Sequence, residues 1–159
     1  MTRNNFAFRD YYKGAIDTND TYLGNIIISA SSGLPQVNMA VPVYSENNET
    51  LIGVWAGGLN LTAFNESPQS LNLTNNERIV YVDQYGYKVA DSDKQLSNNP
   101  KNESFANLKS FEDAIDGKSG SNIEVVNGTK MIVFYEPVKF HSTTWVILWM
   151  QSWNTNTLS

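Results

Sequence analysis

An arginine and two tyrosines lie close together near the start of the chain, in the segment Phe-Ala-Phe-Arg-Asp-Tyr-Tyr at residues 6–12. The guanidinium of Arg9 is planar, and its paired N–H donors suit a carboxylate through two parallel hydrogen bonds. Tyr11 and Tyr12 add apolar ring faces that end in hydroxyl groups. These residue types predict a site that grips a small anion. The alternative is that Arg9 is a surface or salt-bridging residue.

The segment that carries Arg9 is expected to form a short helix or irregular turn packed beside a sheet. Its apolar residues recur at intervals that place several aromatic rings on one face. Three β-prone runs follow at residues 24–31, 36–44 and 51–61, and a Ser/Gly/Pro turn separates the first two. Short runs of this kind bounded by turn residues are typical of antiparallel strands. We therefore expect a pocket between this segment and the sheet.

The strand expected at residues 36–44 alternates in character. Its odd positions are Val37, Met39, Val41 and Val43. Such alternation predicts that this apolar face packs on a core or helix, whereas the face with Asn38 and Tyr44 is more open. Asn38 and Tyr44 are therefore candidates to line the cavity, and simple exposure to solvent is the alternative.

The order of these motifs resembles the second half of an extracellular Cache sensor module, a PAS-like fold found in prokaryotic membrane receptors. In that family, Arg, any residue, Trp and Tyr are followed by a tyrosine-containing loop, a strand that ends Pro-Val, and a last strand of the form Leu-Ile-Gly-Val. The matching residues here are Arg9, Tyr11, Tyr12, Tyr22, Pro42, Val43, Leu51, Ile52, Gly53 and Val54. Tyr11 stands where Trp is common in the family.

The resemblance also implies roles for Tyr22 and Gly58. Tyr22 matches a pocket tyrosine of the family, although a tyrosine before a strand is equally an ordinary core or rim residue. Many amino-acid-binding members carry Asp at the position of Gly58, where it pairs with the ammonium group of the ligand. Glycine cannot form that pair, so a carboxylate or a neutral small molecule is expected rather than a complete amino-acid zwitterion. Gly58 would let a ligand approach the backbone closely.

The second half of the chain repeats this kind of pattern in a more complete form. After a connector at 67–77, we expect a hairpin from residue 78, a helix within 104–117 and three further strands, with an Asn-Gly hairpin turn at 127–128. This part resembles the membrane-proximal module of a double Cache receptor. It predicts an α+β fold of PAS-like antiparallel sheets flanked by helices.

The division into domains follows from the same pattern. Residues 1–66 are a partial membrane-distal module with the ligand pocket, 78–153 a complete membrane-proximal module, and 154–159 a tail. The first module lacks an opening hairpin, so we expect an open sheet edge that a partner chain fills.

Composition restricts the class of protein. The net charge of −5 disfavours nucleic acid as a partner, because nucleic-acid binding needs a basic surface. The chain has no cysteine, no apolar run long enough to span a membrane, and a polar beginning without the features of a signal peptide. Seven Asn-X-Ser/Thr sequons, at residues 19, 48, 60, 65, 72, 102 and 127, favour exposure outside a cell.

No set of residues in the sequence predicts catalysis or a cofactor. His141 is the single histidine, and no Gly-X-Ser-X-Gly motif accompanies it. Asp83, Asp91 and Asp93 lack the ligand spacing of a calcium loop, so we interpret them as acidic residues at the ends of strands. We therefore expect no catalytic residue, no metal site and no cofactor in this chain.

These observations predict the extracellular ligand-sensing domain of a transmembrane receptor. A small molecule, expected to be a carboxylate, would bind between the sheet and the segment from Arg9 to Tyr22, and its preference for one conformation would shift the receptor's equilibrium. The parent protein would be anchored in the membrane and form a homodimer, with a histidine kinase or chemotaxis module as its output. The alternative is a surface interaction or adhesion domain that binds no small molecule. A hydrolase is disfavoured.

Overall fold

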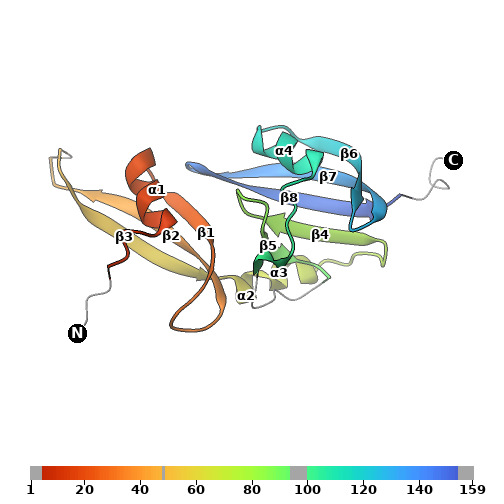
Figure 1. The fold of residues 1–159 in the computed structure, drawn as a ribbon, viewed down its shortest axis with the longest axis horizontal. Helices are drawn as coiled ribbons and strands as arrows, with labels where there is room; N and C mark the ends of the chain where they lie inside the picture. The colour runs from red at the N-terminus through yellow and green to blue at the C-terminus, as the bar shows by residue number, and fades with distance from the viewer. Residues whose placement is uncertain (1–4, 48, 94–99, 154–159) are drawn as a thin grey trace.

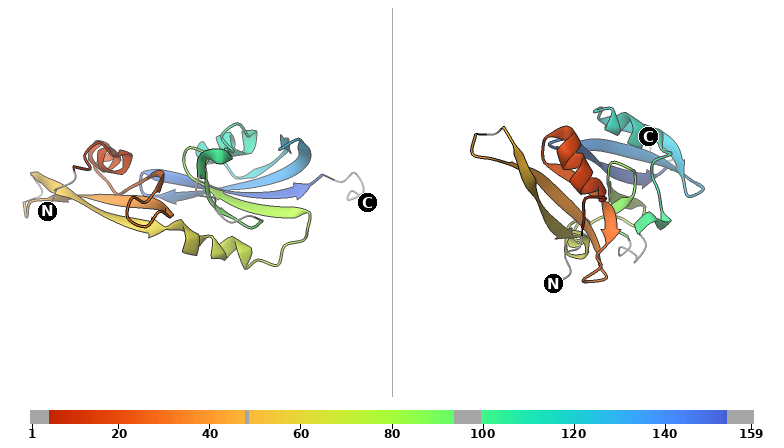
Figure 2. Two further views of the ribbon diagram at one scale, coloured as in Figure 1. Left: turned by 60° about the horizontal axis from the view of Figure 1, so that its bottom comes forward. Right: turned by 60° about the vertical axis from the view of Figure 1, so that its left-hand side comes forward.

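The computed structural model describes residues 5–47, 49–93 and 100–153. They form two antiparallel sheets that lie end to end along the long axis of the molecule, with a helix on each (Figures 1 and 2). This arrangement confirms the predicted α+β fold.

The three-stranded sheet has the order β1-β2-β3. Its strands are β1 (Tyr22–Ile28), β2 (Pro35–Tyr44) and β3 (Leu51–Asn60), and helix α1 (Asp10–Thr18) packs on one face. Tyr11 and Ala15 lie four residues apart in α1, so they share a face, and both are buried with Ala40 of β2. The helix ends at Asn19, whose left-handed backbone (φ of 53°) stops it.

The five-stranded sheet has the order β5-β4-β8-β7-β6. Its strands are β4 (Glu77–Val82), β5 (Lys88–Asp91), β6 (Gly120–Val126), β7 (Thr129–Phe140) and β8 (Thr143–Ser152). Helix α4 (Lys109–Ile115) covers one face, after a single 3₁₀ turn at Pro100–Asn102. The predicted turn between β6 and β7 is confirmed, because Asn127 and Gly128 both have positive φ.

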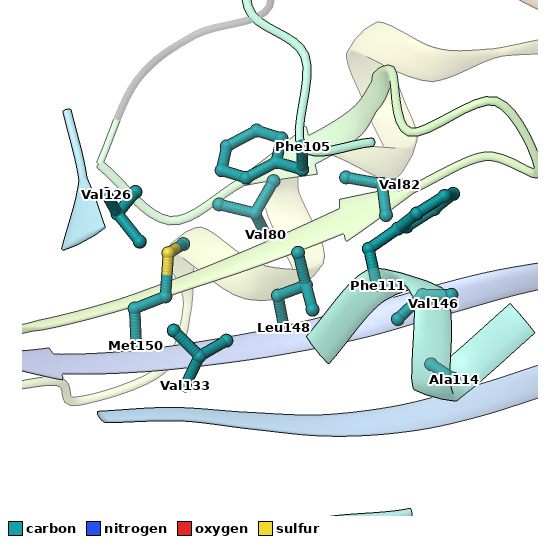
Figure 3. Close-up of a cluster of buried hydrophobic side chains, with 10 residues drawn as sticks. All are labelled: Val80, Val82, Phe105, Phe111, Ala114, Val126, Val133, Val146, Leu148 and Met150. Carbon is teal, nitrogen blue, oxygen red and sulfur yellow. The ribbon is translucent and has the colours of Figure 1, made fainter. Parts of the chain in front are cut away.

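A hydrophobic core fills the space between this sheet and α4 (Figure 3). Val80 and Leu148 point up from the sheet toward Phe105 and Phe111, and Val80, Leu148 and Val133 are completely buried. Fully burying side chains of this size contributes about 1.5–3 kcal/mol each. The core holds the sheet and its helix together as one packed layer.

The connector expected at 67–77 begins with a helix. Helix α3 (Glu66–Gln69) directly follows α2 (Leu61–Phe64), and the side chain of Asn60 caps α2 by accepting from the N–H of Thr62.

The face of β2 expected to be apolar and buried is buried only in part. Val37 is fully buried, but Met39 and Val43 on the same face are both 39% exposed. The helix covers the opposite face, so Ala40 is buried there as well.

The two sheets share a second core. Leu23, Ile26 and Val37 of the three-stranded sheet pack with Val89 and Trp145 of the five-stranded sheet. Leu61 of α2 completes this cluster and is fully buried. The two sheets are therefore joined by apolar packing as well as by the chain itself.

Candidate functional site

A cavity of about 400 Å³ opens between the beginning of α1, the end of β1 and the start of β2. It is lined by Phe6, Arg9, Tyr11, Ile27, Ser29, Ala30, Ser31, Gln36 and Asn38. This volume lies in the range of small-molecule sites, and the lining mixes apolar side chains with a few polar ones.

Arg9 is the only charged residue among the described residues that line the cavity. It immediately precedes the first turn of α1, and its guanidinium carbon lies 4.9 Å from the centre of the Phe8 ring. Within the described part of the chain, Arg9 forms no ion pair, so its donors are available for an incoming acceptor. The cavity therefore offers one positive group with paired donors.

The floor of the cavity is polar. The side-chain amide of Gln36 donates to the Oδ1 of Asn38 at 2.8 Å, and both side chains lie on the face of β2 that α1 covers. Gly58 of β3 is paired with Asn38, and a side chain at Gly58 would come within about 3.2 Å of both amides. Its lack of a side chain leaves room beside the cavity floor.

Asp10, the residue after Arg9, holds α1 against β1. Its Oδ2 accepts a hydrogen bond of 2.5 Å from the backbone N–H of Asn25, where the pairing of β1 with β2 is irregular. Gly24 is required at this contact, because a Cβ there would lie 2.9 Å from the other oxygen of Asp10. This contact sets the position of the helix that carries Arg9.

The structure brings only some of the predicted site residues to the cavity. Arg9, Tyr11 and Asn38 line it, and Gly58 lies next to Asn38. Tyr12 does not line it and packs instead on the buried cluster between α1 and the sheet.

The two tyrosines at the edges of β1 and β2 also lie elsewhere. The ring of Tyr22 packs against Gly14 of α1, where a Cβ would come within 2.4 Å of it. Tyr44 donates to the side chain of Asn19 at the other end of α1.

Sequence reasoning did not assign Phe6, Ile27, Ser29 or Gln36 to the cavity. Gln36 could have been found, because it lies two residues from Asn38 on the same face of a strand. Ile27 and Ser29 belong to β1 and the turn after it. Their position depends on how β1 pairs with β2, with Ile27 opposite Gln36.

The start of β1, at the opposite end of the strand from the cavity, contacts the five-stranded sheet directly. The N–H of Leu23 donates to the hydroxyl of Thr143 at 3.2 Å, and the carbonyl of Leu23 accepts from the side chain of Gln84 at 3.0 Å. A hydrogen bond with Tyr22, together with partial burial, raises the pKa of Tyr85 to about 12. Strand β1 thus runs from the cavity to Gln84, in the turn between β4 and β5, and to Thr143, at the start of β8.

The remaining candidates for metal binding and catalysis are the acidic residues and His141. In the described ranges, no group of three or more histidine or acidic side chains could hold a metal ion. His141 lies in the turn between β7 and β8, with its Nδ1 3.3 Å from Asp20.

No helix in the described part of the chain has the length and hydrophobicity to cross a membrane.

Comparison with protein families places nearly the whole chain in one family. Residues 2–156 match the family model described as Cache domain (dCache_1). No curated protein matches the chain.

Similar folds occur among solved structures of sensory domains. One is the periplasmic sensory domain of the Campylobacter jejuni chemoreceptor Tlp1 (18% identity, TM-score 0.65), where 92% of this chain covers 55% of that chain. The extracellular domain of mmHK1S-Z2, described as a histidine kinase, has 17% identity and a TM-score of 0.70. The match covers 92% of this chain and 56% of that chain. The ligand-binding domain of the Pseudomonas aeruginosa amino acid chemoreceptor PctB, in complex with L-Gln, has 19% identity and a TM-score of 0.69. The match covers 96% of this chain and 60% of that chain.

At these identities the likeness concerns the fold, and the chain spans less than two thirds of the length of each of these structures. The family match and the shared fold agree with the motifs around Arg9 and with the two antiparallel sheets. The chain belongs to the Cache domain family.

Proposed function

We propose that this chain is the ligand-sensing part of a membrane-anchored receptor and that its ligand is a small carboxylate bound at Arg9. The observation that carries the proposal is the 400 Å³ cavity in which Arg9 is the only charged lining residue of the described chain. A carboxylate in this cavity would form two parallel hydrogen bonds with the guanidinium, while Tyr11 and Ile27 contact its apolar part.

The absence of an acid at Gly58 supports a carboxylate without a nearby ammonium group. The lining contains no Asp or Glu among its described residues, so an ammonium would find only the amide and hydroxyl oxygens of residues such as Asn38 and Ser29. PctB was solved with L-Gln, which shows that a domain of this fold holds an amino acid. The cavity of this chain is better suited to a carboxylate that carries no ammonium group.

Binding would be relayed through β1. A ligand changes a conformational equilibrium only by its difference in affinity between the two states. Arg9 precedes Asp10, Asp10 holds the backbone of β1 at Asn25, and the nearby Leu23 bonds with Thr143 of the larger sheet. In the parent receptor this path would carry the response toward the membrane, with the domain on the outer face of the cell.

The test is calorimetric titration with a small carboxylate and its uncharged amide, for example valerate and valeramide. We expect valerate to bind, valeramide to bind at least about tenfold more weakly, and Arg9→Ala to abolish the difference, since a hydrogen bond to a charged group contributes about 1.5–3 kcal/mol. Lys13→Ala is the matched control, because Lys13 is an exposed cation on the same helix that does not line the cavity.

A panel of other small carboxylates, screened by the rise in melting temperature, extends the test to acids of different size. If every acid that binds does so equally well to the wild type and to Arg9→Ala, Arg9 is not the anion site and the proposal fails.

A further inference from the structure

Asp83 is a fully buried acid in the turn between β4 and β5. Its Oδ1 accepts from the backbone N–H groups of Tyr85 and Tyr87, at 2.9 Å each. Its other oxygen, Oδ2, is buried and has no hydrogen-bond partner within the described residues. A buried carboxylate oxygen without a partner disfavours the charged form of the group.

The turn that holds Asp83 meets the free edge of β1, whose other edge is paired with β2. The backbone N–H of Ile26 approaches the carboxylate from β1, but it does not complete a hydrogen bond to Oδ2. The next residue of the turn, Gln84, donates its side-chain amide to the carbonyl of Leu23 at 3.0 Å. Asp83 and Gln84 therefore lie where the smaller sheet docks on the larger one.

Titratable groups surround Asp83 on both sides of this junction. Lys101, in the 3₁₀ turn, acts through its charge to lower the pKa of Asp83. On the other side, the pKa of Tyr85 is raised by a hydrogen bond with Tyr22, by burial, and by the charges of Asp10 and Asp83. Burial is the largest influence on Asp83 itself and raises its pKa above the ordinary value of 3.8, although the surrounding N–H groups act to lower it.

A second buried oxygen beside Asp83 also lacks a partner. It is the Oε1 of Gln84, which forms no hydrogen bond within the described part of the chain. An ionised carboxylate brings only acceptors to this turn, whereas a neutral carboxyl brings one O–H donor. Protonation of Asp83 therefore removes a buried charge and supplies a donor next to unpaired oxygens.

We propose that Asp83 is a proton-sensitive clasp between the two sheets, closed when its carboxyl is neutral and loosened when it is ionised. The proton is exchanged with solvent. Ionisation favours conformations in which the β4–β5 turn moves off β1 and Oδ2 meets water, because those conformations solvate the charge. The acidity of the surroundings thereby acts on the contact through which β1 joins the cavity to the larger sheet, whether or not a ligand binds at Arg9.

The direction of the pH dependence follows from the raised pKa. Because the folded pKa of Asp83 lies above 3.8, its effect on stability is most favourable below pH 3.8 and is lost as the pH rises through the folded pKa. Glu103 behaves in the opposite way, since its contribution is complete above pH 4.5. A loss that develops between pH 4.5 and pH 8 is therefore not due to Glu103.

The first experiment follows amide hydrogen exchange by NMR between pH 4.5 and pH 8, with each rate divided by that of an unstructured chain at the same pH. We expect the protection of the Leu23 amide to fall at least about threefold over this range, since half a pKa unit already changes an equilibrium about threefold. Asp83→Asn should remove the fall, because asparagine offers a neutral oxygen and a donor in the same shape. In urea unfolding at pH 8, Asp83→Asn should be more stable than the wild type.

Two further variants separate Asp83 from the other titratable groups. His141→Asn removes the imidazole that lies 3.3 Å from Asp20 in the turn before Thr143, and the fall in protection should persist. Lys101→Gln should move the midpoint of the fall to higher pH, because the charge of Lys101 lowers the pKa of Asp83. A purely structural role of Asp83 would give no such midpoint to move.

An NMR titration of the Asp83 carboxyl carbon in the wild type measures the pKa directly and does not depend on any variant folding. A folded pKa at or below 3.8 overturns the proposal. A fall in Leu23 protection that Asp83→Asn retains also overturns it, as does an Asp83→Asn protein less stable than the wild type at pH 8, since the fold would then need the charge.

Discussion

Asp10 shows how one side chain determines the geometry of the cavity. Its carboxylate accepts from the backbone N–H of Asn25, and the hydrogen bond is partly buried between helix and strand. Asp10 also lies in the first turn of α1, where a negative charge interacts favourably with the helix dipole. The residue beside it, Arg9, therefore points into the cavity from a helix that is held in place.

The substitution Asp10→Ala is expected to lower the free energy of unfolding by about 1.5–3 kcal/mol, because it leaves a backbone N–H of β1 without its charged acceptor. Urea unfolding followed by circular dichroism measures this loss. Asp17→Ala is the control, because Asp17 is an exposed acid of the same helix and its removal should change stability by less than about 0.5 kcal/mol. Equal effects of the two substitutions would contradict the role given to Asp10.

Strands β4 and β5 are joined to the segment before α4 by a buried group of four charges. Asp91 is fully buried and lies 2.8 Å from both Arg78 and Lys88. Glu103 lies 3.0 Å from Arg78 and 3.1 Å from Lys88. Two cations and two anions balance, so the charges are paired and need no metal ion or ligand.

The two acids of this group have lowered pKa values. Burial alone would raise the pKa of Glu103, but the hydrogen bonds from Arg78 and Asn127 outweigh it and hold that pKa at about 2. Burial opposes ionisation of Asp91 as well, and Arg78 and Lys88 again hold its pKa below the ordinary value. Both acids therefore stabilise the folded state only when ionised.

The sign of the pH dependence follows from these shifts. Because the folded pKa of Glu103 is below its ordinary value of 4.5, its contribution is complete above pH 4.5 and is lost as the pH falls toward about 2. We expect Glu103→Gln to lower stability by about 1.5–3 kcal/mol at pH 7 and to have a progressively smaller effect below pH 4.5. Urea unfolding of both proteins at pH 7, 4 and 3 measures this. A difference that stays constant over this range would exclude ionisation of Glu103 as the cause.

At the scale of the whole molecule, the two sheets depend on one shared core. Leu23 and Val37 come from one sheet, Val89 and Trp145 from the other, and Leu61 lies between them in a short helix. Contacts between residues this far apart in sequence make the two sheets parts of one folding unit. In the proposed function, the effect of a ligand at the cavity would reach the larger sheet through these packed side chains.

The substitution Leu61→Ala tests this unity. Leu61 is fully buried, and its truncation is expected to lower the free energy of unfolding by about 2–5 kcal/mol through lost contacts and the cavity left behind. Thermal unfolding should remain a single transition at a lower temperature, whether followed by tryptophan fluorescence or by far-UV circular dichroism. Leu71→Ala, at a position that is 46% exposed, is the control and should cost little. Two separate transitions in the variant would contradict a shared core.

Much of the fold could be predicted from local patterns. The Asn-Gly turn at 127–128, the alternating strands and the helical spacing around Tyr11 and Ala15 are properties of neighbouring residues. The burial expected for one face of β2 holds for Val37 and fails for Met39 and Val43, because alternation says which residues share a face and not which face a helix will cover. The positions of Tyr12 and Tyr22 likewise depended on how α1 lies on the sheet.

The sequence by itself predicted the class of fold through local patterns and the family through the resemblance of its motifs, and both are confirmed. It also singled out Arg9 as the candidate for binding an anion, because of its residue type and its aromatic neighbours. Only the tertiary structure decided which residues surround Arg9. The cavity is made by two strands and a helix whose relative position is set by Asp10 and by a core shared between sheets. Such contacts depend on distances in space, and the linear order of residues does not contain them.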